Sequence, residues 1–264
     1  HDLMLRLTEI VPREEFLHVP EILYHWRKTP NSTATTVANK QYAVDAGVRC
    51  VTDHLRRVGH EAHVEAINNL TIYNVVWPVE KEPSVSIIIP FRDQVETTRE
   101  CVSRILENTD YRNYDIVLVD NWSSDPETLA FCSEISRKKK VRVLSVKEEF
   151  NSSRLNNLAA AESAAEFLFF MNNDLFVEKP DWLTLVVGEA LAGDDIAAVG
   201  GKFLYPHGTV QHVGVAVGPE GVAKPVHRGP PGPDYGYIGR ALLSPELTAV
   251  TAADIVLRAA AHRH

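Results

Sequence analysis

Four short apolar segments, separated by stretches of helical periodicity, constrain the fold of this chain more than any other feature. Each has the length of a buried β-strand and is far shorter than the ~20 apolar residues that span a membrane. The segments are Val85–Pro90, Asp115–Asp120, Val141–Val146 and Phe167–Met171, and the predicted helices between them are Thr97–Leu106, Pro126–Lys138 and Ser152–Ala165. Strands joined by helices of this length pair in parallel. The sequence therefore predicts an α/β fold with a Rossmann-like, mostly parallel sheet and flanking helices.

The residues before these segments form a separate region. A polar, proline-containing stretch, Val79–Ser84, is typical of a linker and predicts a boundary between residues 1–79 and 80–264. Residues 1–79 contain one strong helical pattern, Thr36–Val58, which Gly59 ends. We therefore expect a small, mainly helical segment ahead of the α/β domain.

The charge and the cysteine content limit which partners the protein is expected to bind and in which cellular compartment it is expected to lie. The chain has 27 basic and 35 acidic residues, a net charge of −8, which argues against a nucleic-acid partner. Cys50, Cys101 and Cys132 are far apart, which favours free thiols in a reducing compartment and thus a cytoplasmic location. Cys50 and His54 are one helical turn apart and could hold zinc, but no second pair of ligands accompanies them.

Each predicted strand is followed by a polar cluster that contains a carboxylate. The clusters are Pro90–Asp93, Asp120–Asp125, Glu149–Arg154 and Asn172–Asp174. In an open parallel sheet, ligands bind beyond the carboxyl ends of the strands, so we expect the four clusters to meet at one edge. Together they suit a nucleotide whose diphosphate is bridged by a metal ion.

Asp174 is the candidate metal ligand. It follows an apolar strand directly, where its carboxylate can hold Mg²⁺ or Mn²⁺, which take hard oxygen ligands from proteins and phosphates. An acidic domain needs local positive charge to bind an anionic diphosphate, and a metal ion supplies it. The alternative for Asn172–Asp174 is an ordinary turn, because Asn and Asp favour turns.

Several other residues have both a functional and a structural interpretation. Asp120 could contact a ligand or cap the following helix. His212 could touch substrate or belong to a strand, and His25–Arg27 could form a carbohydrate platform or pack internally. Arg137–Lys140 could end a helix in solvent or attract an anionic membrane surface. Gly229–Gly236 could be a mobile loop over a ligand or an exposed connection.

Six ordered motifs carry a family resemblance: Val85–Asp93, Val119–Ser124, Phe150–Asn157, Phe170–Asp174, Val199–Pro206 and Gln211–Gly214. Together they resemble family 2 glycosyltransferases of the GT-A fold, the kind found in bacterial polysaccharide assembly. The resemblance implies that a nucleotide-sugar donor is surrounded by Pro90, Phe91, Arg92, Asp93, Asp120, Asn121, Ser123 and Asn173, and that Asn151, Arg154 and Asn157 line its pocket. It also implies that Asn172 and Asp174 hold the metal, with Asn172 replacing the first aspartate of the Asp-x-Asp motif.

The first region resembles part of the same family. Asp2–Arg6, His18–Arg27 and Ser32–Ala34 are similar to the carboxyl end of a preceding glycosyltransferase domain. The resemblance implies that residues 1–79 are the tail of one domain and residues 80–264 the donor-binding part of the next, without its acceptor side. The general base would then lie outside the chain.

The activity implied is transfer of a sugar, with inversion and metal assistance, from a UDP-, dTDP- or GDP-linked donor. The acceptor would be a glycan or a lipid-linked glycan of the cell envelope, at the inner face of the membrane and without a transmembrane span. Two other functions stay open. One is nucleotidyl transfer, which attacks phosphorus, and the other is nucleotide or glycan binding without catalysis.

Overall fold

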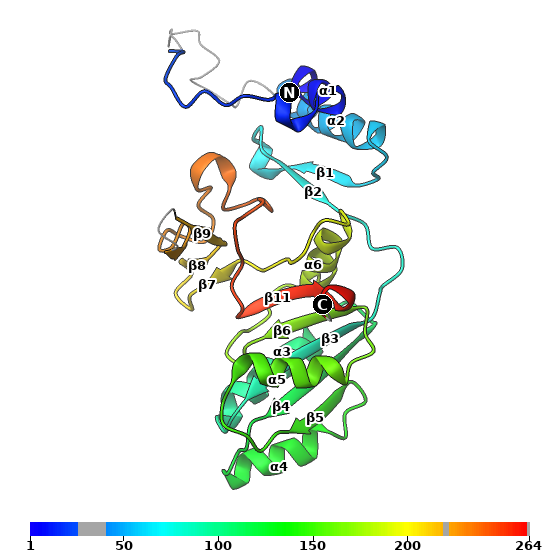
Figure 1. Cartoon of the computed structure of the whole chain (residues 1–264), viewed down its shortest axis with the longest axis vertical. Coiled ribbons are helices and arrows are strands. Elements are labelled where there is room, and N and C mark those ends of the chain that lie inside the picture. Colours follow the sequence, from blue (N-terminus) through cyan, green and yellow to red (C-terminus); the bar gives the residue numbers. More distant parts are fainter. Residues whose placement is uncertain (26–40, 219–221, 263–264) are drawn as a thin grey trace. The chain divides into compact units, whose positions relative to one another are not determined.

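The computed structural model describes residues 1–25, 41–218 and 222–262 and contains two compact units (Figure 1). The first is His1–Pro78 with Tyr237–Ser244, and the second is Val79–Gly236 with Pro245–His264. Trp26, Arg27, residues 32–34 and the predicted helix start at 36–40 lie outside the described residues.

The first unit combines helices with a β-hairpin. Its elements are α1 (Asp2–Ile10), α2 (Gln41–Arg57), β1 (His63–Ala66), β2 (Tyr73–Val76) and the short 3₁₀ helices Arg13–Glu15, Ile67–Asn69 and Tyr237–Gly239. The unit is mainly helical, as predicted, and adds a β-hairpin that the sequence did not predict. Asn68 and Asn69 have φ of 51° and 55°, a left-handed conformation that Asn tolerates, so the chain reverses there and β1 pairs antiparallel with β2.

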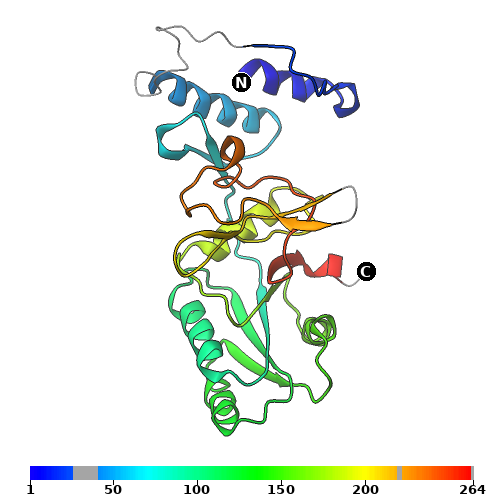
Figure 2. The same cartoon turned by 90° about the vertical axis from the view of Figure 1, so that its left-hand side faces the viewer.

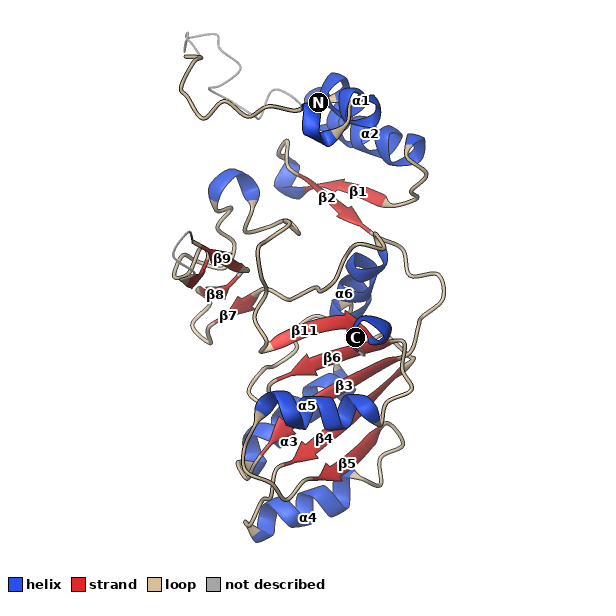
Figure 3. Ribbon diagram, in the orientation of Figure 1, coloured by secondary structure: helices blue, strands red, loops and turns tan. Residues whose placement is uncertain are grey.

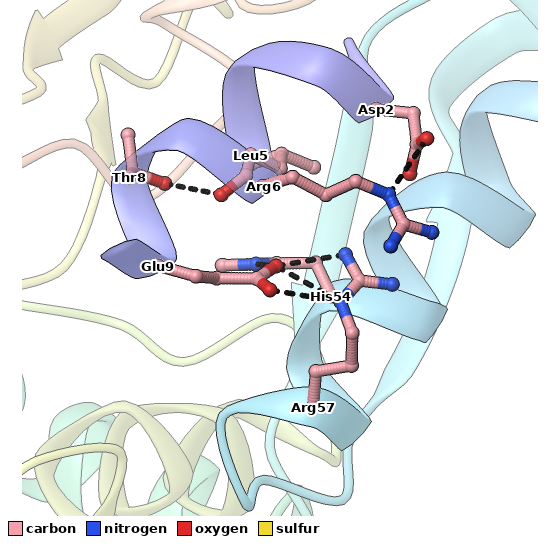
Figure 4. A network of polar contacts seen from close by, with 7 residues as sticks. All are labelled: Asp2, Leu5, Arg6, Thr8, Glu9, His54 and Arg57. Atoms are coloured by element: carbon pink, nitrogen blue, oxygen red, sulfur yellow. Dashed lines mark hydrogen bonds and ion pairs between the residues drawn. The ribbon is translucent and has the colours of Figure 1, made fainter. Parts of the chain in front are cut away.

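A cluster of ion pairs and hydrogen bonds joins α1 to α2 (Figure 4). Arg57 Nη2 donates to Glu9 Oε1 at 2.7 Å, and His54 Nδ1 lies 2.7 Å from the same oxygen. These hydrogen bonds, from Arg57 first and His54 second, lower the pKa of Glu9 to about 2. The His54 ring is thus engaged by a carboxylate of α1.

The second unit is built on a five-stranded sheet (Figure 3). Its strands are β3 (Val85–Phe91), β4 (Tyr114–Asp120), β5 (Val141–Ser145), β6 (Phe167–Met171) and β11 (Asp254–Arg258), in the order β11-β6-β3-β4-β5. The pairs among β3, β4, β5 and β6 are parallel, and β11 is antiparallel to β6. This confirms the predicted α/β fold with a mostly parallel sheet.

Helices cover both faces of this sheet (Figures 1 and 2). They are α3 (Val95–Glu107), α4 (Pro126–Ile135), α5 (Ser152–Ala161), α6 (Trp182–Leu191) and α7 (Ala259–His262). Side chains of α3, α4 and α6 pack with Ile87 and Ile89 on one face, and side chains of α5 and α7 pack with Ile88 on the other. Successive residues of a strand point to opposite faces, so a continuous apolar run fills both cores.

The helix after β4 is shorter than predicted. It ends at Ile135, and Lys140, expected in solvent, donates to the Arg112 carbonyl at 3.0 Å. The Lys140 ammonium also lies 3.7 Å from the centre of the Tyr114 ring. Part of the Arg137–Lys140 run therefore packs against the end of the sheet, because a lysine stem can cover an aromatic ring while its amine keeps a partner.

Two small antiparallel pairs complete the second unit: β7 (Phe203–Leu204) with β8 (Val210–His212), and β9 (Val215–Val217) with β10 (Ala223–Pro225). The Gly229–Gly236 segment is bound to the first pair, since the Val210 N–H donates to the Pro230 carbonyl at 2.7 Å and Lys202 Nζ to that of Gly232 at 2.7 Å. These bonds favour a fixed connection. Among the helices described, none has the length and apolarity needed to cross a membrane.

Candidate functional site

The carboxyl ends of β3, β4, β5 and β6 lie at one edge of the sheet, as parallel pairing requires, and the antiparallel β11 begins there. Four predicted polar clusters follow these strand ends. Their side chains have different roles. Some are buried and hydrogen-bonded within the loops, and others are exposed to solvent.

Asp93 ties the loop after β3 to the loop after β4. Its Oδ1 accepts from the N–H groups of Ser124 and Asp125 at 2.9 and 3.0 Å, and its own N–H donates to Ser123 Oγ at 2.8 Å. Asp93 has a φ of 50°, which these three bonds hold in place. The two loops therefore form one rigid element.

Asp120 is not the cap of α4, so that alternative is wrong. The cap is Asp125, whose carboxylate accepts from Thr128 Oγ1 at 2.8 Å and from the Thr128 N–H at 3.1 Å, bonds that lower its pKa. Asp120 is 5% exposed, and its Oδ1 accepts the Ser123 N–H at 3.0 Å. Its carboxyl group lies at the strand end, where the prediction for a ligand-binding aspartate placed it.

Three residues expected around the donor are instead buried in the framework. The Phe91 ring belongs to the core, and Ser123 Oγ accepts the hydrogen bond from the Asp93 N–H. Asn121 is 1% exposed, and its amide donates to the Glu148 carbonyl at 2.9 Å, which joins the loops after β4 and β5. Of the predicted residues in these two loops, only Arg92 is exposed, while Pro90 and Asp93 are half-buried.

The predicted pocket residues of α5 lie together. Asn151 caps the helix by accepting the Arg154 N–H at 3.0 Å, and the Arg154 guanidinium pairs with the Glu148 carboxylate at 2.8 Å. Both residues line a hollow of about 370 Å³ with Ser153, Asn157 and Leu158. This volume is at the low end of the ~300–1,000 Å³ typical of small-molecule sites.

The loop after β6 presents the candidate metal ligands. Its backbone is fixed because the Asn172 N–H donates to the Ala253 carbonyl at 2.9 Å, and Asn173 Nδ2 donates to Thr98 Oγ1 on α3 at 3.0 Å. The Asn172 and Asp174 side chains are exposed. Burial, with the nearby Asp174 charge as a smaller cause, raises the pKa of the Cys101 thiol to about 12.

These two side chains fit a divalent ion only as part of a shared coordination shell. Among the described residues no three His, Cys, Asp or Glu side chains are grouped to hold a metal. The Asp174 carboxylate and the Asn172 amide oxygen supply two hard ligands, and Mg²⁺ commonly completes such a set with water and substrate phosphates. The donor set therefore suits an ion that arrives with a diphosphate.

Residues 86–214 match the model of the glycosyl transferase family 2. This part of the chain is a family 2 glycosyltransferase domain. The O-antigen biosynthesis protein RfbC of Myxococcus xanthus is 39% identical over 259 residues, which are 98% of this chain and 20% of that protein. The uncharacterized protein y4gI of Sinorhizobium fredii is 38% identical over 260 residues, 98% of this chain and 28% of that protein. The chain thus spans less than a third of these relatives.

Among solved structures, this chain is similar to the mannosyltransferase PcManGT from Pyrobaculum calidifontis in complex with GDP-Man and Mn²⁺. The TM-score is 0.42 and the identity 19%, with 62% of this chain and 46% of that chain covered.

Two further residues of the second unit, Trp122 and Asp254, were not selected as site residues from the sequence. Trp122 is 53% exposed and has a φ of 59°, unusual for a bulky side chain, between two buried residues of the loop after β4. A large aromatic residue inside a turn-forming Asp-Asn-Trp-Ser sequence was the available signal. Asp254, placed by the sequence in an apolar run, is a buried carboxyl group at the start of β11.

His212 has the structural role that was one of its two interpretations. It is buried on β8, and its ring stacks on Phe203 with centroids 5.5 Å apart. Burial lowers the pKa of His212, because it disfavours the charged form of the ring.

Proposed function

We propose that the glycosyltransferase domain transfers a sugar, with inversion, from a UDP-, dTDP- or GDP-linked donor to a hydroxyl of a glycan or lipid-linked acceptor. Family membership supports transfer, and the 39% identity to RfbC supports a role in envelope polysaccharide assembly. The single structural observation that carries the proposal is the convergence of the loops after β3, β4 and β6 at one sheet edge, with the Asp174 carboxylate exposed there.

In this proposal the rigid loops after β3 and β4 bind the nucleoside. The Asp120 carboxyl group accepts a hydrogen bond from the base or ribose, and Arg92 supplies an exposed positive charge. The bonds of Asp93 fix both loops before the ligand arrives, so little ordering is required on binding. In the same proposal, Asn151, Arg154 and Asn157, which line the hollow at α5, contact another part of the donor.

Asp174 and Asn172 would hold Mg²⁺ or Mn²⁺, and the bound ion would neutralise charge on the diphosphate leaving group. The acceptor hydroxyl needs a general base within roughly 2.6–3.2 Å.

We further propose that residues 1–79 are the tail of a preceding glycosyltransferase domain. The match to RfbC supports this arrangement, because it runs through both regions of the chain. All three cysteines are free thiols, which suits the proposed location at the cytoplasmic side of a membrane.

The test is thermal stabilisation by UDP, dTDP and GDP, with Mn²⁺ or with excess chelator. A nucleotide at ~100 times its dissociation constant should stabilise the protein by about 2.7 kcal/mol, and only with Mn²⁺. Asp174→Ala should abolish this effect, while Glu178→Ala, which removes a nearby exposed carboxylate, should preserve it.

Three results would contradict parts of the proposal. Equal stabilisation in excess chelator would show that nucleotide binding does not require a metal ion. If none of the three nucleotides stabilises the protein, the proposed binding of a nucleotide-sugar donor is contradicted. With a nucleotide-sugar substrate, release of pyrophosphate in place of a nucleoside diphosphate would favour nucleotidyl transfer.

A further inference from the structure

Trp122 lies in the loop after β4, at the sheet edge where the proposed donor site is built. Its neighbours in the chain are buried and bonded on both sides. The Asn121 N–H donates to the Phe91 carbonyl at 2.9 Å, and the Ser123 N–H donates to Asp120 Oδ1 at 3.0 Å. The backbone that carries the indole is therefore fixed before any ligand binds.

The backbone conformation of Trp122 is unfavourable for a residue of its size. Its φ of 59° lies in the left-handed region, which a bulky side chain rarely adopts. Such a conformation persists where the surrounding structure imposes it, as the bonds of Asn121 and Ser123 do here. Glycine adopts the same φ without this cost, so a tryptophan at position 122 makes the loop less stable than a glycine would.

The indole of Trp122 also lacks the contacts that the other described tryptophans make. The Trp182 ring meets the Phe169 ring edge-on with centroids 5.1 Å apart, and the Trp77 ring meets the His60 ring edge-on at 5.5 Å. Trp122 is 53% exposed, and its side chain has no ring contact and no hydrogen bond among the described residues. Internal packing therefore does not account for a large aromatic ring held in a strained loop.

We propose that Trp122 is a nucleobase-binding residue, with its indole stacked on the base of the donor. This inference rests on the proposed function and names the contact that the base makes. An aromatic side chain on a fixed backbone stacks on another flat ring with little loss of conformational freedom. Because more than half of the indole surface is in solvent, a base reaches it directly and no pocket has to open.

The position of Trp122 along the sheet favours the base over the sugar or the diphosphate. Strand order places β3 between β4 and β6, so the loops that contain Trp122 and Asp174 start about 10 Å apart. In the proposed function the diphosphate is held with its metal ion at Asp174. The base and the sugar are joined to opposite ends of the diphosphate, and the nucleoside is assigned to the loops after β3 and β4. The base is thus the flat ring that extends toward Trp122.

The experiment measures binding by calorimetry in Mn²⁺ for UDP, dTDP and GDP and for inorganic pyrophosphate, which has no base. Trp122→Gly should weaken the binding of each nucleoside diphosphate that the wild type binds by about tenfold, and leave pyrophosphate affinity within about twofold. It should also raise the Tm of the free protein, because glycine adopts a φ of 59° without strain.

A conservative variant and a matched control separate stacking from other effects. Trp122→Phe keeps an aromatic face and should bind nucleoside diphosphates within about threefold of wild type. It should also lose the fall in tryptophan fluorescence that a stacked base causes in the wild type. Tyr42→Ala removes an exposed aromatic ring from α2 and should bind all four ligands as the wild type does.

Three results would overturn the inference. They are unchanged nucleoside diphosphate affinity in Trp122→Gly, an equal loss of pyrophosphate affinity with a lower Tm in that variant, and Trp122→Phe binding no more tightly than Trp122→Gly. In each of these cases, nucleoside diphosphate binding by the wild type leaves the proposed function standing. Failure of the wild type to bind any of the three nucleotides would refute the proposed function and this inference with it.

Discussion

The structural role of each aspartate at the sheet edge depends on the groups that surround it in the fold. Asp120, Asp125 and Asp93 are close in the structure, yet one ends a strand, one caps a helix and one joins two loops. The sequence predicted that Asp120 and Asp93 would meet at one edge, because strand ends determine that. It could not predict which carboxylate oxygens accept hydrogen bonds within the protein, because the folded loops position the backbone N–H groups that donate them.

Glu9 gives a pH-dependent prediction at this scale. Its pKa is lowered from 4.5 to about 2 by Arg57 and His54, so the ionised form is favoured in the folded state. The stabilisation should be present above pH 4.5 and be lost as the pH falls from 4.5 to 2. Denaturant unfolding of wild type and Glu9→Gln across this window should show a difference that shrinks with acidity. Glu14→Gln, in an exposed position, should show no such trend.

Helices and strands were predicted best where the pattern is local. The strand Phe167–Met171 was predicted with the bounds of β6, and Val85–Pro90 misses β3 only by Phe91, because short apolar runs mark buried strands. The β1–β2 hairpin was missed because its turn depends on two asparagines in the left-handed region, and its strands are only partly buried. The end of α4 was misplaced because the helical pattern continues into the charged Arg137–Lys140 run.

The cap of α4 gives a prediction at the scale of elements. Asp125→Ala removes the acceptor for the Thr128 N–H and hydroxyl and should lower the denaturant midpoint of the second unit. Ser124→Ala, next to the cap, should be nearly neutral, because Ser124 contributes its backbone N–H to Asp93. Denaturant unfolding measures both. A cost for Asp125→Ala no larger than that for Ser124→Ala would contradict the capping role.

At the scale of the whole molecule, the sequence predicted which loops come together but not how deeply their residues lie. Parallel topology brings Asp93, Asp120 and Asp174 to one edge, and that follows from strand order alone. The burial of Phe91 and Asn121 depends on packing between loops. Asp254 could not be predicted at that edge, because antiparallel pairing of β11 with β6 brings it there from a distant part of the chain.

That late pairing also sets the order in which the sheet can be completed during synthesis. β6 leaves the ribosome some eighty residues before its partner β11, so its Phe-Leu-Phe-Phe-Met edge must wait unpaired, a condition that favours aggregation. Val256→Pro removes the N–H that bonds to the Val199 carbonyl at 2.9 Å on the side of β11 away from β6. Because this bond helps to hold β11 in place for pairing with β6, its loss should increase light scattering during refolding. Val256→Ala keeps this N–H and should scatter less. The folding yield of the sheet thus depends on β11, although its other strands are synthesised much earlier.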